Sequence, residues 1–321
     1  MSPSTRFCSW TRLGLFCALV LLSACRGDAI DPAADHPIPP FTIPPLGEAH
    51  EFCFVLGDMG TGREDQYRVA EVMAARARHD PPAFLITVGD NFYESGVDSP
   101  RDPQFWTSFH DVYDDPALAV PVHPTLGNHD HRGDPDAQVA HSQEHPLWRM
   151  PARHYSFSRS LKDGTRIDFF ALDTTPIEEG EDGSETQAGW LSSSLTRSEA
   201  RWKIVFGHHP LYSSGDHGGS TRMREALEQI LEERKADLYL AGHDHHMEVL
   251  KPTSSVLHVV AGAAGGPDKA YPVTWGEQTI YAATGGGILL LRLERDLLLL
   301  EFIRMDGKTQ YATLLEKHGF K

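Results

Sequence analysis

Five short apolar segments of the chain each end in a glycine that is followed directly by a residue able to bind a metal ion. These junctions read L-G-D, V-G-D-N-F-Y, L-G-N-H-D, F-G-H-H-P and A-G-H-D-H-H, starting at residues 56, 88, 126, 206 and 241. A single Gly-Asp pair is a common turn dipeptide and indicates nothing more. Five such junctions predict a sheet that delivers ligands to one edge, because the carboxyl ends of parallel strands converge there.

The rest of the chain alternates between strand-like and helix-like patterns. Strands are expected at residues 52–56, 83–88, 122–126, 167–172, 203–206 and 238–241. Helices are expected at residues 63–79, 103–112, 187–195 and 222–234. From residue 256 onward the pattern is entirely β, and the acidic stretch 178–185 is expected to be an exposed loop. This order predicts an α/β fold with two packed mixed β-sheets flanked by helices.

The N-terminal segment reads as a targeting sequence. Two arginines precede an apolar run at residues 13–22, which is too short to span a bilayer and has the length of a signal-peptide core. The run ends in L-S-A-C, which resembles the lipobox of bacterial lipoproteins and implies that Cys25 carries the lipid anchor. The alternative is an ordinary secretory signal. We therefore expect a signal peptide at 1–24, a proline-rich linker at 25–49, a catalytic domain at 50–316 and a tail at 317–321.

Charge and cysteine content limit the functions that this chain can have. Its net charge of −16 argues against a nucleic-acid-binding surface. An anionic substrate would need a local positive charge, which a metal ion can supply. Cys8 and Cys17 leave with the signal, so no disulfide is expected once Cys25 is acylated. Cys53 is expected to be a small buried hydrophobic residue.

The residue types at the five junctions indicate a site for two metal ions. Of the 18 histidines, 12 fall between His123 and His246, and several follow strands. Carboxylate, imidazole, phenolate and amide oxygen are ligands that Fe, Mn and Zn accept. One aspartate can bridge two metals, and such a pair stabilises both the attacking and the leaving oxygen of a phosphoryl displacement.

The ordered motifs G-D, G-D-N-F-Y, G-N-H-D, G-H-H-P and G-H-D-H resemble those of the calcineurin-like metallophosphoesterases. The tyrosine of G-D-N-F-Y is similar to that of the purple acid phosphatases, and the longer runs resemble the small tartrate-resistant type. The resemblance covers residues 50–316. It implies a four-layer α-β-β-α sandwich.

The resemblance also implies a role for each matching residue. Asp58, Tyr93 and His245 would hold Fe(III). A second metal, which is Fe(II), Zn or Mn in the family, would be held by Asn128, His208 and His243. Asp90 would bridge the two metals. His129 would contact the substrate phosphate, and His217, in the less closely matching S-G-D-H-G-G, would donate a proton to the leaving group.

The implied function is hydrolysis of phosphate monoesters by a metal-bound hydroxide, in an enzyme anchored in the cell envelope through Cys25. One alternative is a phosphodiesterase or nucleotide pyrophosphatase on the same site, and Tyr93 argues against it because other branches of the superfamily lack that ligand. Another is a catalytically silent, metal- or phosphate-binding surface lipoprotein, which needs neither His129 nor His217. The oligomeric state stays open, with a monomer expected.

Neighbours of the motifs are expected to support the ligands. Asp130 and Asp244 are candidates for orienting metal-bound imidazoles. His131, His209 and His246 are expected to lie outside the ligand set, and His123 is expected to be structural. Asp173, after the strand at 167–172, is expected to cap or anchor a loop.

Overall fold

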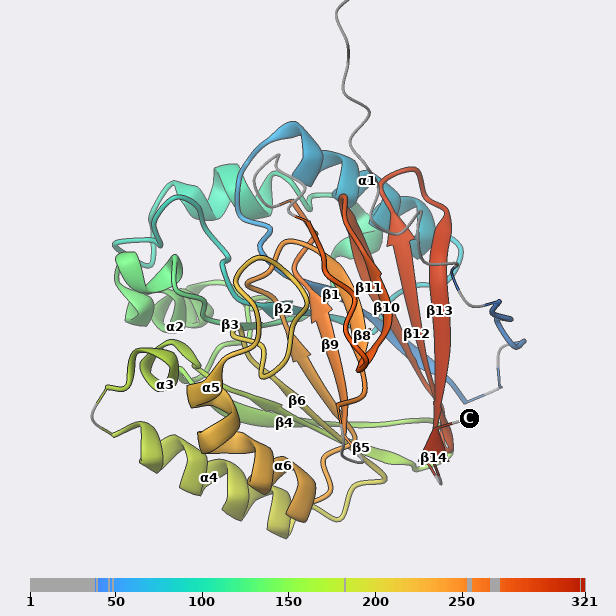
Figure 1. Cartoon of the computed structure of the whole chain (residues 1–321). Helices are drawn as coiled ribbons and strands as arrows, with labels where there is room; N and C mark the ends of the chain where they lie inside the picture. The colour runs from blue at the N-terminus through green and yellow to red at the C-terminus, as the bar shows by residue number, and fades with distance from the viewer. Residues whose placement is uncertain are drawn as a thin grey trace, which may run out of the picture. The chain divides into compact units, whose positions relative to one another are not determined.

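The computed structural model describes residues 38, 40–45, 47, 49–181, 183–252, 256–265, 272–317 and 319–320. Within them two seven-stranded sheets lie face to face (Figure 1). The first has the order β14-β13-β12-β11-β1-β2-β3, with strands Gly319–Phe320, Thr309–Glu316, Leu297–Arg304, Gly287–Leu293, Glu51–Leu56, Phe84–Val88 and Val122–Thr125. The second has the order β10-β8-β9-β7-β6-β5-β4, with strands Thr279–Ala283, Met247–Leu250, Leu257–Ala261, Leu238–Ala241, Trp202–Phe206, Arg166–Ala171 and Tyr155–Ser160.

Both sheets are mixed, as the sequence predicts. In the first sheet β1, β2 and β3 run parallel, and β1 pairs antiparallel with β11 on its other side. In the second sheet β5, β6, β7 and β9 run parallel, with antiparallel strands at both edges. The parallel strands therefore occupy the part of each sheet where a ligand-binding edge is expected.

Alternation along the strands divides the core into two layers. Phe169 of β5 and Ile204 of β6 belong to the large cluster between the sheets, whereas Phe170 and Val205 face the helices. Successive side chains of a strand point to opposite faces, so one strand serves both layers. Cys53 of β1 is fully buried and free, as expected.

Helices cover the outer faces of the sheets. On the first sheet lies α1 (Glu64–Ala77), which buries Val69 and Met73 in the cluster between and around the strands. On the second lie α3 (Thr175–Glu179), α4 (Ser184–Arg197), α5 (Thr221–Met223) and α6 (Gln229–Glu233) (Figure 1). The arrangement is the four-layer α-β-β-α sandwich that the sequence resemblance implies.

Several local predictions need correction. The acidic stretch 178–185 is a loop only between α3 and α4, because α3 ends at Glu179 and α4 begins at Ser184. Within the range 103–112 the helix covers residues 104–110 and is π-helical at Trp106–His110. A second π-helical turn, Arg224–Glu228, interrupts the helix predicted at 222–234. Part of the predicted tail is a strand, since β14 pairs with β13.

A further helix and two strands were not predicted from the sequence either. These are α2 (Pro135–Glu144), β4 and β8. Helix α2 has almost no apolar face, so its periodicity is weak, but Asp134 caps it by accepting from the amide of Asp136 and Pro135 starts its first turn. Cap chemistry was the signal that could have revealed it.

The expected signal peptide, Cys25 and most of the linker lie outside the described residues. At the end of the linker, Phe41 packs edge-on against Tyr311, and the Pro44 carbonyl accepts a hydrogen bond from Arg292. Among the helices that the structure describes, none has the length and apolar content needed to cross a membrane.

Candidate metal centre

The seven predicted ligands lie together at the ends of five strands. Asp58, Asp90 and Asn128 follow β1, β2 and β3, while the histidines His208, His243 and His245 follow β6 and β7. Three of these residues have backbone φ angles in the left-handed region, namely Asp58 at 57°, Asp90 at 51° and His243 at 71°. Non-glycine residues rarely adopt this conformation, and where they do the strain often marks a functional site.

Asp58, Tyr93 and His245 form one group of donors. The Tyr93 hydroxyl lies 3.1 Å from Oδ1 of Asp58 and 3.2 Å from Nε2 of His245. That Nε2 in turn lies 3.3 Å from Oδ1 of Asp58. Three potential ligand atoms, one from each residue, thus lie close together.

Asn128, His208 and His243 form a second group. The Oδ1 atom of Asn128 lies 3.0 Å from Nε2 of His208 and 3.1 Å from Nδ1 of His243. The two ring nitrogens are 3.3 Å apart. For a metal bound at about 2.1 Å with near-tetrahedral angles, ligand atoms would be about 3.4 Å apart, so the spacing suits a shared cation.

Asp90 lies between the two groups. Its Oδ2 atom is 2.8 Å from the Tyr93 hydroxyl, and its Oδ1 atom is 3.5 Å from Nε2 of His208. A carboxylate that presents one oxygen to each group has the geometry required of a bridge. Gly127 makes this approach possible, because a Cβ atom there would lie only 2.2 Å from Oδ1 of Asp90.

Backbone contacts fix which ring nitrogen of His208 faces the centre. Its Nδ1 lies 2.9 Å from the carbonyl oxygen of Val88, which can only accept, so Nδ1 donates and Nε2 is left to bind a cation. Thr174 supports the same loop, because its Oγ1 accepts from the amides of His208 and His209. The sequence analysis did not single out Thr174.

The buried charges of these side chains favour the binding of cations. Burial and the neighbouring carboxylates of Asp58 and Asp90 raise the pKa of Tyr93 well above its usual value. Burial opposes charge on His208, but Asp90 and Asp58 outweigh it and raise its pKa. Burial likewise opposes charge on Asp58, yet the hydrogen bond with His245 and the charge of His208 lower its pKa. Buried carboxylates of this kind need compensating positive charge, which cations provide.

His129 lies beside the predicted bridge. Its amide donates to Oδ1 of Asp90 at 2.9 Å, and its ring packs against Tyr93 with centroids 4.4 Å apart. Nδ1 lies 2.8 Å from the Glu94 carbonyl oxygen, and Nε2 is directed toward the centre, 4.0 Å from Oδ2 of Asp90. Arg132, which the sequence analysis did not single out, brings a permanent positive charge within 3.1 Å of His129.

His217 is exposed and lies next to His243, a member of the second group of donors. Its ring centroid lies 4.4 Å from that of His243. The amide of His217 donates to Oδ1 of Asp244 at 2.8 Å, and Ser213 donates to Oδ2 of the same carboxylate. Asp244 therefore holds the loop that presents His217, and no hydrogen bond from it to a predicted ligand imidazole is found in the described part of the chain. The expected role of Asp244 needs correction accordingly.

Asp130 also supports the centre through the backbone rather than through an imidazole. Its carboxylate accepts from the amides of Asn91 and Gly127 and from the side chain of Gln138, which ties the loops after β2 and β3 together. Burial and the charge of Asp90 raise the pKa of Asp130 to about 7.

The remaining neighbours have partners of their own. His131 contacts Asp173 at 2.8 Å, and His246 contacts Glu248 at 2.9 Å. His209 is buried beside His243 and contacts Oγ1 of Thr174 at 2.9 Å. His123 stacks on Phe157, as expected of a structural residue. Asp173 anchors a loop, since its backbone pairs with the amide group of Gln187.

Comparison with known proteins agrees with this geometry. The family model described as calcineurin-like phosphoesterase matches residues 54–247, which span all seven predicted ligands. Purple acid phosphatase 4 of Arabidopsis thaliana is 31% identical over 279 residues, covering 79% of this chain and 80% of its own length. The chain belongs to the calcineurin-like phosphoesterases, within the purple acid phosphatases.

Two further proteins are similar to the chain as well. Tartrate-resistant acid phosphatase type 5 of Sus scrofa is 31% identical over 196 residues, covering 56% of this chain and 58% of its own length. Among solved structures, GAP50, described as the anchor in the inner membrane complex of Plasmodium, has a TM-score of 0.76 at 23% identity. It covers 85% of this chain and 90% of its own, which shows that the two share a fold.

Proposed function

We propose that this purple acid phosphatase hydrolyses phosphate monoesters at a binuclear metal centre. The single observation that carries the proposal is the geometry of Asp90. This carboxylate presents one oxygen to the group of Asp58, Tyr93 and His245, and the other to the group of Asn128, His208 and His243. A site for one cation would not need a second set of donors.

The donor sets differ in a way that suits two different cations. The first set contains a carboxylate, a phenol and an imidazole, which suits Fe(III). The second contains an amide oxygen and two imidazoles, which suits Fe(II), Zn or Mn. When bound, such a pair supplies a water of lowered pKa and neutralises charge on a phosphate. Family membership supports this assignment.

Two histidines outside the donor sets are assigned to the substrate. His129 directs Nε2 toward the bridge, and Arg132 beside it adds positive charge, so the pair can bind a phosphate oxygen. His217 is exposed above His243 and is held by Asp244, so it can reach a leaving group that departs away from the centre. We assign it as the general acid that protonates the leaving oxygen.

Two rival functions predict different residues at the site. A phosphodiesterase would not require the phenol of Tyr93, and its presence between both carboxylates favours the purple acid type. A silent binding protein would not require an exposed histidine at position 217. The silent binding protein stays a rival because the chain shares its fold with a Plasmodium protein described as an anchor.

The visible spectrum of the purified domain tests the proposal directly. A phenolate on Fe(III) should produce a broad charge-transfer band, and Tyr93→Phe should abolish it while the protein stays folded. Metal analysis and a panel of phosphate esters complete the experiment. A colourless wild type with both metals bound, or one that holds two zinc ions as purified, would show that the Fe(III) assignment is wrong.

We also propose that Cys25 is acylated and holds the protein at the cell envelope. The support is the L-S-A-C sequence after a short apolar run and the proline-rich segment that follows. Cys25→Ala should leave the precursor uncleaved or release soluble protein. Wild-type protein that is soluble and lacks the mass of a lipid would contradict the anchor.

A further inference from the structure

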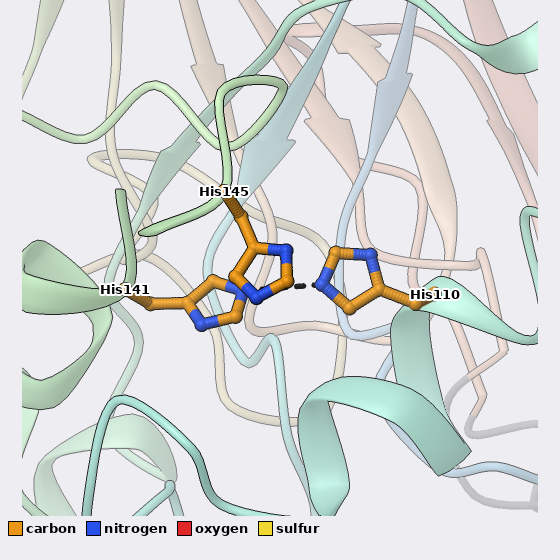
Figure 2. A group of neighbouring side chains, drawn as sticks. All are labelled: His110, His141 and His145. Atoms are coloured by element: carbon orange, nitrogen blue, oxygen red, sulfur yellow. Dashed lines mark hydrogen bonds between the residues drawn. The ribbon is translucent and has the colours of Figure 1, made fainter. Parts of the chain in front are cut away.

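Three histidines outside the active centre form a separate cluster. His141 and His145 lie at the end of α2, one turn apart, and His110 ends the π-helical turn Trp106–His110. Figure 2 shows the three rings turned toward one another from these two segments. Each offers one ring nitrogen, and these atoms all lie within 4.8 Å of one another.

The spacing of two of these nitrogens already suits a shared metal ion. Nε2 of His110 lies 3.1 Å from Nε2 of His141. A tetrahedral zinc ion with Zn–N bonds of about 2.0–2.1 Å separates two ligand nitrogens by about 3.3 Å. The third nitrogen, that of His145, lies within 4.8 Å of the other two and would have to come closer to share the ion. A small rotation of this half-exposed side chain provides that movement.

His141 has the tautomer that a metal-binding histidine requires. Its Nδ1 lies 2.7 Å from the carbonyl oxygen of Pro100, which can only accept a hydrogen bond. Nδ1 therefore carries the proton, and Nε2 presents a lone pair to the cluster. Metal-binding histidines characteristically donate their other ring N–H to a carbonyl or carboxylate in this way.

The environment favours the neutral form of His110 and His141, which is the form that binds a metal. Burial lowers the pKa of His141 to about 4, and burial together with His145 lowers that of His110. Nearby Glu144 is already paired with Arg101 through two contacts, at 2.8 and 3.1 Å. The carboxyl end of α2 adds a partial negative charge that favours a cation.

We propose that His110, His141 and His145 bind a third metal ion, of the zinc type, that is independent of the active centre. Three imidazoles without a carboxylate suit a borderline cation such as Zn²⁺ and do not suit Mg²⁺. A water would complete the coordination on the exposed side.

The location indicates what such an ion would do. Through His110 and His141 it would join the π-helical turn to α2. His141 also holds Pro100, in the segment that leads from Tyr93 to the π-helical turn. The ion would therefore stabilise the segment that follows a predicted active-site ligand. The alternative is a purely aromatic cluster, because Phe105 stacks on His141 with centroids 3.5 Å apart and His141 stacks on His145 at 4.1 Å.

The number of zinc ions bound by the whole protein distinguishes a metal site from a purely aromatic cluster. The purified protein is titrated with Zn²⁺ against a chromophoric chelator, with Mg²⁺ as a second probe. The variants are His110→Gln and His145→Gln, with His154→Gln as a matched control, since His154 is a partly buried histidine that packs on Trp190 outside both clusters. Wild type and His154→Gln should bind one zinc more than the two cluster variants, and all four should hydrolyse phosphate esters at the same rate.

Equal zinc stoichiometry in all four proteins would overturn the proposal, as would an additional zinc that binds only at millimolar concentration. Because ester hydrolysis is measured separately, failure of the third site is distinguishable from failure of the proposed activity. A zinc-soaked crystal gives a positional test. An anomalous difference peak among the three imidazoles supports the site, and a peak elsewhere on the surface contradicts it.

Discussion

The active centre and the three-histidine cluster gather similar side chains under opposite electrostatic conditions. In the centre, Asp58 and Asp90 are buried beside the imidazoles, and they raise the pKa of His208. In the cluster of His110, His141 and His145 no carboxylate belongs to the donor set, and burial lowers the pKa of His141. Protonation is thus favoured on His208 in the centre and disfavoured on His110 and His141 in the cluster, although burial also lowers the pKa of His243 in the centre.

This difference explains how each site is built. A buried carboxylate must be compensated, so the centre needs several loops to bring histidines and backbone amides to it. It draws on five strands of both sheets and accepts left-handed backbone at three positions. The three-histidine cluster is built from only one helix end and one π-helical turn, because its donor set contains no carboxylate that must be compensated.

The largest expected effect is that of removing the bridge. Asp90→Ala should lower kcat for an aryl phosphate by about 10³-fold or more, because the two cations lose the group that joins them. Metal content should fall with the rate. The matched variant at the other site, His110→Gln, should keep both the rate and the active-centre metals. An Asp90→Ala protein with most of the wild-type rate would remove the basis of the binuclear assignment.

A smaller loss is expected at His217. Since His217 lies outside the donor sets, His217→Ala should keep both active-centre metals and any visible colour. The rate should fall by about 10²–10⁴-fold for an alkyl phosphate, and less for an aryl phosphate whose leaving group departs without a proton. Loss of metal would identify His217 as a ligand, and equal losses on both esters would assign it to phosphate binding instead.

Asp244 should act through the position of His217. Asp244→Ala releases the amide of His217 and the hydroxyl of Ser213, so kcat should fall by about 10- to 100-fold. Asp244→Asn retains a carbonyl oxygen that can accept the same amide, and it should lose less. The measurement is the ratio of alkyl to aryl rates together with metal content. A loss that is equal for both esters would indicate a general structural defect.

Removing the active-centre metals should account for most of the loss of unfolding free energy on chelation. Where free metal exceeds its Kd by 100- to 1,000-fold, chelation should lower the free energy of unfolding by about 2.7–4.1 kcal/mol for each ion removed. His110→Gln should show the same loss, because its change lies outside the centre. Chemical denaturation with and without chelator measures it. A chelator effect confined to the wild type would place the stabilising metal at the three-histidine cluster instead.

The smallest effect is expected from the third ion. Zinc added at about tenfold over its Kd should raise the stability of the metal-loaded wild type by about 1.4 kcal/mol. His145→Gln should show no increase, and His154→Gln should match the wild type. Thermal unfolding with stepwise zinc follows the change. An identical response in all three proteins would contradict a separate site.

Much of the active centre was readable from the chain itself. The five glycine junctions predicted parallel strands, and the structure places all seven predicted ligands at the ends of those strands. This succeeded because the signal is local, since each junction carries its strand, its turn and its ligand within a few residues. The helices of clear periodicity, such as α1, were predicted for the same reason.

Tertiary structure alone decided which residues from distant motifs meet. Asp130 looked like a partner for imidazoles, but folding directs its carboxylate to the amides of two other loops. Arg132 and Thr174 carry no motif, and only packing brings them to the centre. The three-histidine cluster was invisible for the same reason. His110 and His141 are 31 residues apart, and neither α2 nor the π-helical turn has a strong pattern, so their meeting depends on long-range packing that no local sequence signal records.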